Sequence, residues 1–192
     1  MSCSDLYSFP LDVWGAVGSQ ISSNPIICGG YIGRDHLSDE CFVYGKQNTW
    51  EFHTKMNIRR AYPARITYNN SFHIFGGYEY DHGILQSSEI IGETGETQIG
   101  PDMPIPLHFH AMASFNESMS MLIGGESNYD SYLSLTFYYD HSRQEFIQGP
   151  ELLEGRILHS AGKFLDQINF VKLDYSSSLY HFKVTDFSNY IV

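Results

Sequence analysis

The chain has 192 residues, of which 42% are apolar and 15% aromatic, so it can bury a substantial core and does not have the composition of a disordered protein. Its formal net charge of −11 excludes the cationic surface that a nucleic-acid partner or an anionic membrane requires. No segment approaches the roughly 20 consecutive apolar residues of a membrane-spanning helix, so no membrane insertion is expected. The first ten residues also lack the basic and apolar regions of a signal peptide.

A repeat of 47 to 48 residues runs through the chain. Its strongest marker is a glycine pair that follows a short apolar run, and the pair occurs three times: Gly29 and Gly30, Gly76 and Gly77, and Gly124 and Gly125. Two further positions recur in register with the glycines, one filled by Tyr44, Ile91 and Tyr139 and the other by Trp50, Thr97 and Phe146. A repeat of this length indicates stacked structural units.

Within each repeat the pattern predicts short strands separated by turns. The runs are rich in Ile, Phe and Tyr, are bounded by Gly, Asn and Pro, and show no sustained helical period. In chain order they are 14–18 and 25–28 in the first unit, 64–68, 72–76, 87–91 and 97–99 in the second, and 158–164 and 179–184 in a fourth unit that lacks the glycine pair. We therefore predict an all-β propeller, a single domain of residues 1–192, with about four four-stranded antiparallel blades at 13–53, 60–100, 108–149 and 157–192.

This pattern resembles the kelch repeat family. The residues that carry the resemblance are Ile27 to Gly30, Tyr44 and Trp50 in the first unit, Ile74 to Gly77 with Gly100 and Pro101 in the second, and Leu122 to Gly125, Tyr138 to Asp140, Phe146, Gly149 and Pro150 in the third. The resemblance implies a kelch-type β-propeller that binds a protein partner through the loops of one rim, without catalysis or a cofactor. Because kelch-like rings close with more blades than this chain supplies, we expect an incomplete, open propeller that needs further blades or a partner to cover its ends.

The loop rim supplies the candidate partner-binding residues. In kelch-like propellers this rim combines the loops between the second and third strands with the connections between blades. Tyr and Arg are the residue types that most often dominate binding energy at interfaces. The candidates are Tyr31, Arg34, His36, Arg59, Arg60, Tyr78, Tyr80, His82, Tyr129 and Arg156. The alternative for the arginines is internal pairing with the acidic excess.

Three cysteines occur, and two of them fall in one predicted blade. Cys28 ends the second strand and Cys41 opens the third, so a cross-strand disulfide is geometrically feasible, and two separate buried thiols are the alternative. The equivalent positions hold Phe75 with Ser88 and Ile123 with Thr136.

Two glycosylation sequons begin at Asn69 and Asn116, both in the turn between the first two strands of a unit. Asn is common in such turns, and turn chemistry is the favoured explanation. Together with the cysteine pair, the sequons favour a secreted or extracellular protein over a cytoplasmic one.

No catalytic or metal site is predicted. The sequence has no C-x-x-C pair, no G-x-S-x-G elbow and no glycine-rich phosphate loop. His108 and His110 alternate along one strand, but His110 aligns with His159, which favours a structural role. Two alternatives remain open: a fragment of a copper radical oxidase built on a kelch propeller, and the substrate-recognition part of a ubiquitin-ligase adaptor.

Overall fold

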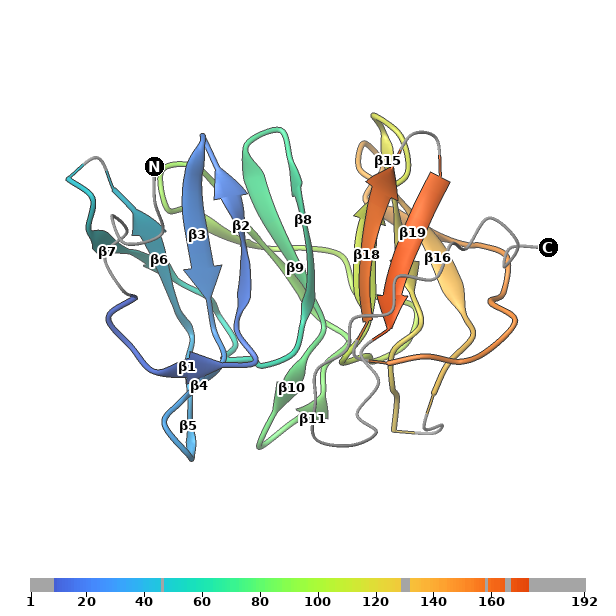
Figure 1. Cartoon of the computed structure of the whole chain (residues 1–192), viewed down its shortest axis with the longest axis horizontal. Coiled ribbons are helices and arrows are strands. Elements are labelled where there is room, and N and C mark those ends of the chain that lie inside the picture. The colour runs from blue at the N-terminus through green and yellow to red at the C-terminus, as the bar shows by residue number, and fades with distance from the viewer. Residues whose placement is uncertain (1–8, 46, 129–131, 158, 165–166, 173–192) are drawn as a thin grey trace.

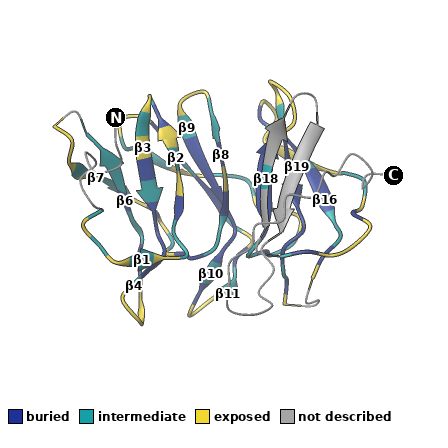
Figure 2. Ribbon diagram, in the orientation of Figure 1, coloured by how far each residue is buried: buried dark blue, intermediate teal, exposed yellow. Residues whose placement is uncertain are grey.

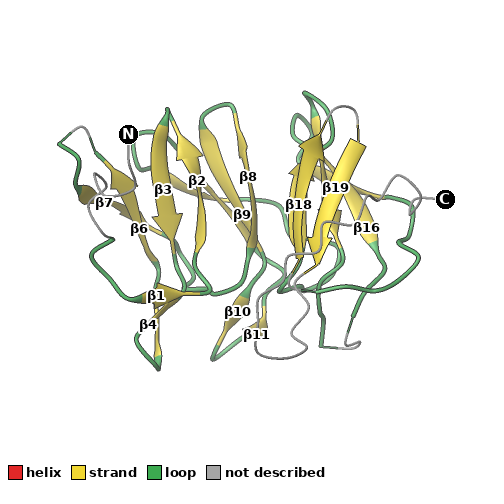
Figure 3. Ribbon diagram, in the orientation of Figure 1, coloured by secondary structure: helices red, strands yellow, loops and turns green. Residues whose placement is uncertain are grey.

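The computed structural model describes residues 9–45, 47–128, 132–157, 159–164 and 167–172, and this part of the chain is built of strands and loops (Figure 3). No helix in this part is long and apolar enough to cross a lipid bilayer. The predicted fold class is confirmed, because the strands form several separate four-stranded antiparallel sheets, as expected of propeller blades.

Three complete blades follow one another along the chain (Figure 1). The first contains β2 (Val17–Ile21), β3 (Asn24–Cys28), β6 (Glu40–Tyr44) and β7 (Trp50–Lys55). The second contains β8 (Ala64–Tyr68), β9 (Ser71–Phe75), β12 (Ser88–Ile91) and β13 (Thr97–Ile99). The third contains β14 (Ala111–Ser114), β15 (Met119–Ile123), β16 (Thr136–Asp140) and β17 (Glu145–Gln148). A further hairpin of β18 (His159–Phe164) and β19 (Gln167–Lys172) lies beside β14.

Shorter strands extend the blades at one edge. β1 (Val13–Trp14), β4 (Tyr31–Ile32) and β5 (His36–Leu37) form a small three-stranded sheet. β10 (Tyr78–Glu79) and β11 (Gly83–Ile84) form a hairpin in the second blade. The prediction that residues 14–18 form the inner strand of the first blade needs correction. Gly15 has φ +66°, which turns the chain there, so Trp14 pairs with Tyr31 in the small sheet and the inner strand begins at Val17.

One backbone hydrogen-bond scheme repeats in all three blades. The amide of the second glycine of each pair donates to a carbonyl in the connection to the next blade: Gly30 to Arg60 at 2.9 Å, Gly77 to Leu107 at 2.8 Å, and Gly125 to Arg156 at 2.8 Å. The close approach of the glycine pair to the connection leaves no space for a side chain, since a Cβ at Gly29 would lie 2.5 Å from the Arg60 carbonyl oxygen. The glycine pairs therefore join each blade to the next connection.

The hydrophobic core lies between the blades (Figure 2). The seam between the first two blades buries Val17, Ile21, Ile26, Cys28, Cys41 and Met56 against Phe72, Ile74 and Ile91. The next seam buries Ala64, Ile66 and Phe75 against Met103, Leu107, Met112, Leu122, Leu133, Phe137 and Tyr139. Each blade thus depends on its neighbour for burial, as in other repeat folds. Among the described residues the blades stop short of a closed ring.

Candidate functional site

The loops between second and third strands meet the blade connections at one edge, which we call the lower rim (Figure 1). It comprises residues 12–16, 29–38, 59–63, 76–85, 107–110 and 124–128. Equivalent antiparallel pairings form it in each blade: Trp14 with Tyr31, Ala61 with Tyr78, and His108 with Glu126. Because the sheets anchor both sides of every pairing, the rim residues are presented from a rigid frame.

Aromatic side chains from all three blades gather on this rim. The rings of Trp14 and Tyr31 stack with centroids 4.2 Å apart, and Tyr80 meets Tyr31 edge-on at 5.9 Å. Tyr62 lies 6.0 Å from Tyr31 and 4.3 Å from Phe109, which belongs to the third blade. We call Trp14, Tyr31, Tyr62, Tyr78, Tyr80, His108 and Phe109 the aromatic cluster.

The cluster is partly open to solvent. Trp14 and Tyr80 are each 47% exposed, whereas Tyr31 between them is 7% exposed. The indole Nε1 of Trp14 donates to the Gly33 carbonyl at 2.8 Å, which fixes the orientation of the ring. The rim therefore presents exposed aromatic surface on a buried aromatic support.

The backbone beneath the cluster is held in an unusual conformation. Gly15, Tyr62 and Phe109 occupy the same repeat position, with φ of +66°, +55° and +53°. The Tyr62 amide donates to the Gly15 carbonyl at 2.8 Å, and the Phe109 amide donates to the Tyr62 carbonyl at 3.2 Å. Left-handed backbone costs a residue with a side chain roughly 1–3 kcal/mol, so the blades impose this conformation and fix where the two rings stand.

Several tyrosine hydroxyls are close neighbours in the cluster. Burial raises the pKa of Tyr31 to about 12, and the Tyr80 hydroxyl adds to this shift both by its charge and by a hydrogen bond. Tyr62 and Tyr78 contribute in the same direction. Tyr31 therefore stays protonated and neutral at physiological pH.

A buried carboxylate fixes the β10–β11 hairpin within the rim. Glu79 accepts from Arg59 Nε at 2.6 Å, from His82 Nδ1 at 2.8 Å and from the amides of Asp81 and His82. Burial alone would raise the pKa of Glu79, but these donors outweigh it and lower the pKa to about 2. Arg59 also binds Asp81 at 2.8 Å, so one exposed arginine serves two carboxylates.

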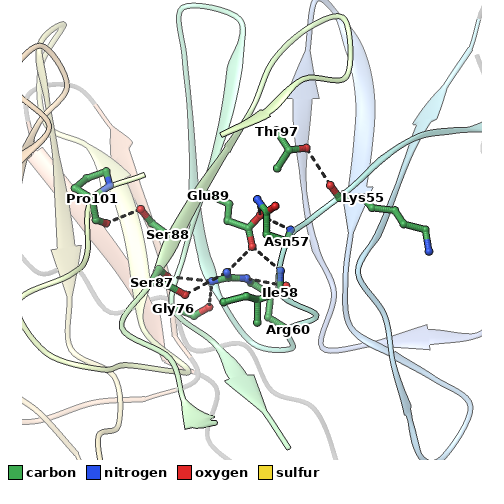
Figure 4. A network of polar contacts seen from close by, with 10 residues as sticks. All are labelled: Lys55, Asn57, Ile58, Arg60, Gly76, Ser87, Ser88, Glu89, Thr97 and Pro101. Atoms are coloured by element: carbon green, nitrogen blue, oxygen red, sulfur yellow. Dashed lines mark hydrogen bonds and ion pairs between the residues drawn. The ribbon is translucent and has the colours of Figure 1, made fainter. Parts of the chain in front are cut away.

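Arg60 is not on the surface, which corrects its place among the candidate residues. Its side chain is 0% exposed, and its guanidinium binds Glu89 at 2.7 Å and donates to the carbonyls of Gly76 and Ser87 (Figure 4). Glu89 also accepts from the amides of Asn57 and Ile58. The pair thus joins the connection between the first two blades to β12. Arg156, the equivalent of Arg60 before the fourth unit, is buried as well.

The other candidates are on the rim where the structure describes them. Arg34 is exposed in the loop between β4 and β5, His36 is exposed at the start of β5, and the side chain of His82 is 67% exposed. Tyr129 lies outside the described residues. Trp14, Tyr62 and Phe109 were not among the residues predicted from the sequence. Each aligns with a rim residue of another repeat, and this alignment could have revealed them.

Cys28 and Cys41 face one another across β3 and β6. They are direct partners in the ladder, as are Phe75 with Ser88 and Ile123 with Thr136 in the other blades, so the predicted equivalence is confirmed. Their sulfurs are 2.03 Å apart, at bonding distance, and both residues are fully buried. The structure therefore contains the cross-strand disulfide that the sequence allowed.

The sequon asparagines lie in turns. Asn69 and Asn70 have φ of +46° and +55°, and they connect β8 to β9. Asn116 Oδ1 accepts from the amides of Ser118 and Met119 at 2.9 and 2.8 Å. Turn chemistry thus accounts for these asparagines, and glycosylation at either remains a prediction.

A histidine pair that sequence reasoning did not select lies in the seam between the second and third blades. His141 stacks on Tyr68 with centroids 4.0 Å apart, and its Nε2 is 2.9 Å from Ser120 Oγ. His73 is 6.2 Å from His141, and burial, followed by the charge of His141, lowers the pKa of His73 to about 4. Across the described ranges, no group of three or more His, Cys, Asp or Glu side chains is placed to hold a metal ion.

Comparison with known proteins gives one distant relationship. No family model matches the chain. The chain is 25% identical to human "Kelch-like protein 15" in an alignment that covers 83% of this chain and 31% of that protein. The chain thus spans about a third of the length of this relative. Glycine-paired, four-stranded antiparallel sheets and this similarity together make the chain a distant homologue of Kelch-like protein 15, with sheets consistent with kelch blades.

Proposed function

We propose that this chain is a kelch-propeller segment that binds a protein partner through its lower rim and carries out no catalysis. The observation that carries the proposal is the aromatic cluster, in which Trp14 and Tyr80 are half exposed and both contact the buried ring of Tyr31. Tyr and Trp supply large contact areas with few rotatable bonds, which is why they dominate binding energy at interfaces. The hydrogen bond from Trp14 to Gly33 and the imposed backbone at Tyr62 hold these rings in place before a partner arrives.

The same proposal includes an incomplete propeller. The face of the first blade that looks away from the second carries Phe42, Trp50 and Phe52, and Phe52 is 56% exposed. Phe9 packs edge-on against Phe42 and Trp50, with centroids 5.6 and 5.0 Å away. An exposed aromatic face of this kind supports the proposal that further blades or a partner pack against it.

The rim proposal is tested by affinity capture with the whole chain. We expect Trp14→Ser with Tyr80→Ser to lose partners that the wild type retains from a cell lysate. The matched control replaces Ile99 and Phe115 by serine, because both are exposed apolar residues outside the lower rim. Circular dichroism melting curves establish that both double variants are folded. Equal capture by the rim variant and the wild type would refute binding through this rim.

A further inference from the structure

The charge of the lower rim complements its aromatic surface. Five acidic residues lie on the rim: Asp12, Asp35, Glu79, Asp81 and Glu126. Its three arginines are Arg34, Arg59 and Arg60, and Arg60 is already bound to Glu89 inside the molecule. Arg59 is shared between Glu79 and Asp81. The rim is therefore anionic around the aromatic cluster, in keeping with the net charge of −11 for the whole chain.

Trp14 is the best-placed aromatic surface for a cation. One face of its indole stacks on Tyr31 at 4.2 Å, with the rings 18° from parallel, and the side chain nevertheless remains 47% exposed. Tyr80 meets Tyr31 edge-on, with centroids 5.9 Å apart, and is as exposed as Trp14. Indole and phenol faces attract guanidinium and ammonium groups, and Trp is the strongest of these partners. A fixed indole ring also loses little conformational entropy when a ligand stacks on it.

We infer that the lower rim recognises a polypeptide segment through an arginine side chain, which stacks on Trp14 and Tyr80 while the rim carboxylates attract its charge. This inference rests on the proposed function and specifies the partner's chemistry. Arginine fits better than lysine because its planar guanidinium stacks on rings and is more weakly hydrated. An acidic segment is excluded as the ligand because the rim carboxylates would repel it.

The test uses a random peptide array and the intact 192-residue chain. The array contains every amino acid at the same frequency. It is probed with the wild type, with Trp14→Ala and Tyr80→Ala, and with the control Phe115→Ala, which changes an exposed phenylalanine outside the rim. We expect arginine to be enriched among the peptides that the wild type and Phe115→Ala bind, and those peptides to be lost with Trp14→Ala and Tyr80→Ala. Rim-dependent peptides without arginine enrichment would overturn this inference and leave the proposed function standing. If the array yields no rim-dependent peptides, both fail.

A second measurement separates charge from shape. The best array peptide is titrated by calorimetry in its arginine form and with that arginine replaced by citrulline, which keeps the planar group and removes the charge. We expect citrulline and Trp14→Ala each to weaken binding about tenfold. Replacement by lysine should weaken binding less than citrulline does. Equal affinity of the arginine and citrulline peptides would contradict the inference.

Discussion

At the scale of single residues, two adjacent arginines have opposite roles. Arg59 is half exposed and binds Glu79 and Asp81 on the rim, while Arg60 is fully buried and binds Glu89. Burial lowers the pKa of Arg60, and the neighbouring carboxylate of Glu89 opposes that shift. The buried pair is costly to break because one charge would be left without its partner in a dry seam.

Arg60→Ala is therefore expected to destabilise the protein far more than Arg59→Ala. The first change leaves Glu89 buried and without its cation, with a cost of about 3–5 kcal/mol in the free energy of unfolding. The second removes one of the donors to buried Glu79, but Glu79 keeps His82 Nδ1 and the amides of Asp81 and His82, so we expect a clearly smaller cost. Urea denaturation of the two variants gives both values. Similar midpoints for the two would show that Arg60 is not a structural residue.

His73 makes the seam between the second and third blades sensitive to acid. Its pKa is about 4 in the folded protein against an ordinary value of 6.5, so the unfolded chain binds the proton more readily between these values. The contribution of neutral His73 to the free energy of unfolding is therefore fully present above about pH 6.5 and is lost as the pH falls towards 4.

We expect the wild type to lose on the order of 2 kcal/mol through this residue between pH 7 and pH 5. His73→Gln should flatten this part of the pH profile, whereas His36→Gln, at an exposed rim position, should not. Denaturant unfolding at a series of pH values gives the profiles. Parallel profiles for the wild type and His73→Gln would mean that His73 does not titrate on unfolding.

At the scale of elements, the repeat spacing predicts the pairing of strands well. The predicted opposition of Cys28 with Cys41, and of Ile123 with Thr136, is the observed ladder register. Such agreement arises because each strand pair is local and its glycine pair marks the same point in every blade. Contacts between residues far apart in the sequence were harder to predict from the repeat. Glu89 follows Arg60 by 29 positions, and nothing in the repeat indicates that this carboxylate turns towards the preceding connection.

Gly77 and Gly83 lie in the same blade but require glycine for different reasons: a close backbone approach with positive φ at Gly77, and positive φ alone at Gly83. Both have positive φ, but a Cβ at Gly77 would lie 2.7 Å from the Ala61 carbonyl oxygen, whereas a Cβ at Gly83 would meet nothing within 4 Å. Gly83→Ala should cost about 1 kcal/mol from backbone strain alone. Gly77→Ala should cost at least about 2 kcal/mol more, because the connection between blades must move. Thermal unfolding of both variants tests this, and equal costs would assign the glycine pair to turn geometry only.

At the scale of the whole molecule, the arrangement leaves one blade face without a neighbouring blade among the described residues. This face carries Phe42, Trp50 and Phe52 on the first blade. The sequence predicted the open arc from the number of repeats. It did not predict the packing of Phe9 across Phe42 and Trp50, because the residues before the first blade carry no repeat signal.

We expect the isolated chain to self-associate through this face. Phe52→Glu should shift the protein towards monomer in sedimentation velocity, because a charge there opposes burial of the face. Ile99→Glu, at a more exposed position on β13, is the matched control and should leave the distribution unchanged. A monodisperse, cooperatively unfolding wild-type monomer would contradict the incomplete propeller.

The hydrogen-bond scheme of the glycine pairs has a consequence for how such a rim can diversify. The bonds from Gly30 to Arg60 and from Gly77 to Leu107 use only main-chain atoms. Arg60 and Leu107 are buried, and the link between blades is the same although one is an arginine and the other a leucine, so it does not depend on side-chain identity. Mutations that change rim side chains can accumulate while the backbone linkage is retained, so new binding preferences can arise in one blade without redesign of its neighbours.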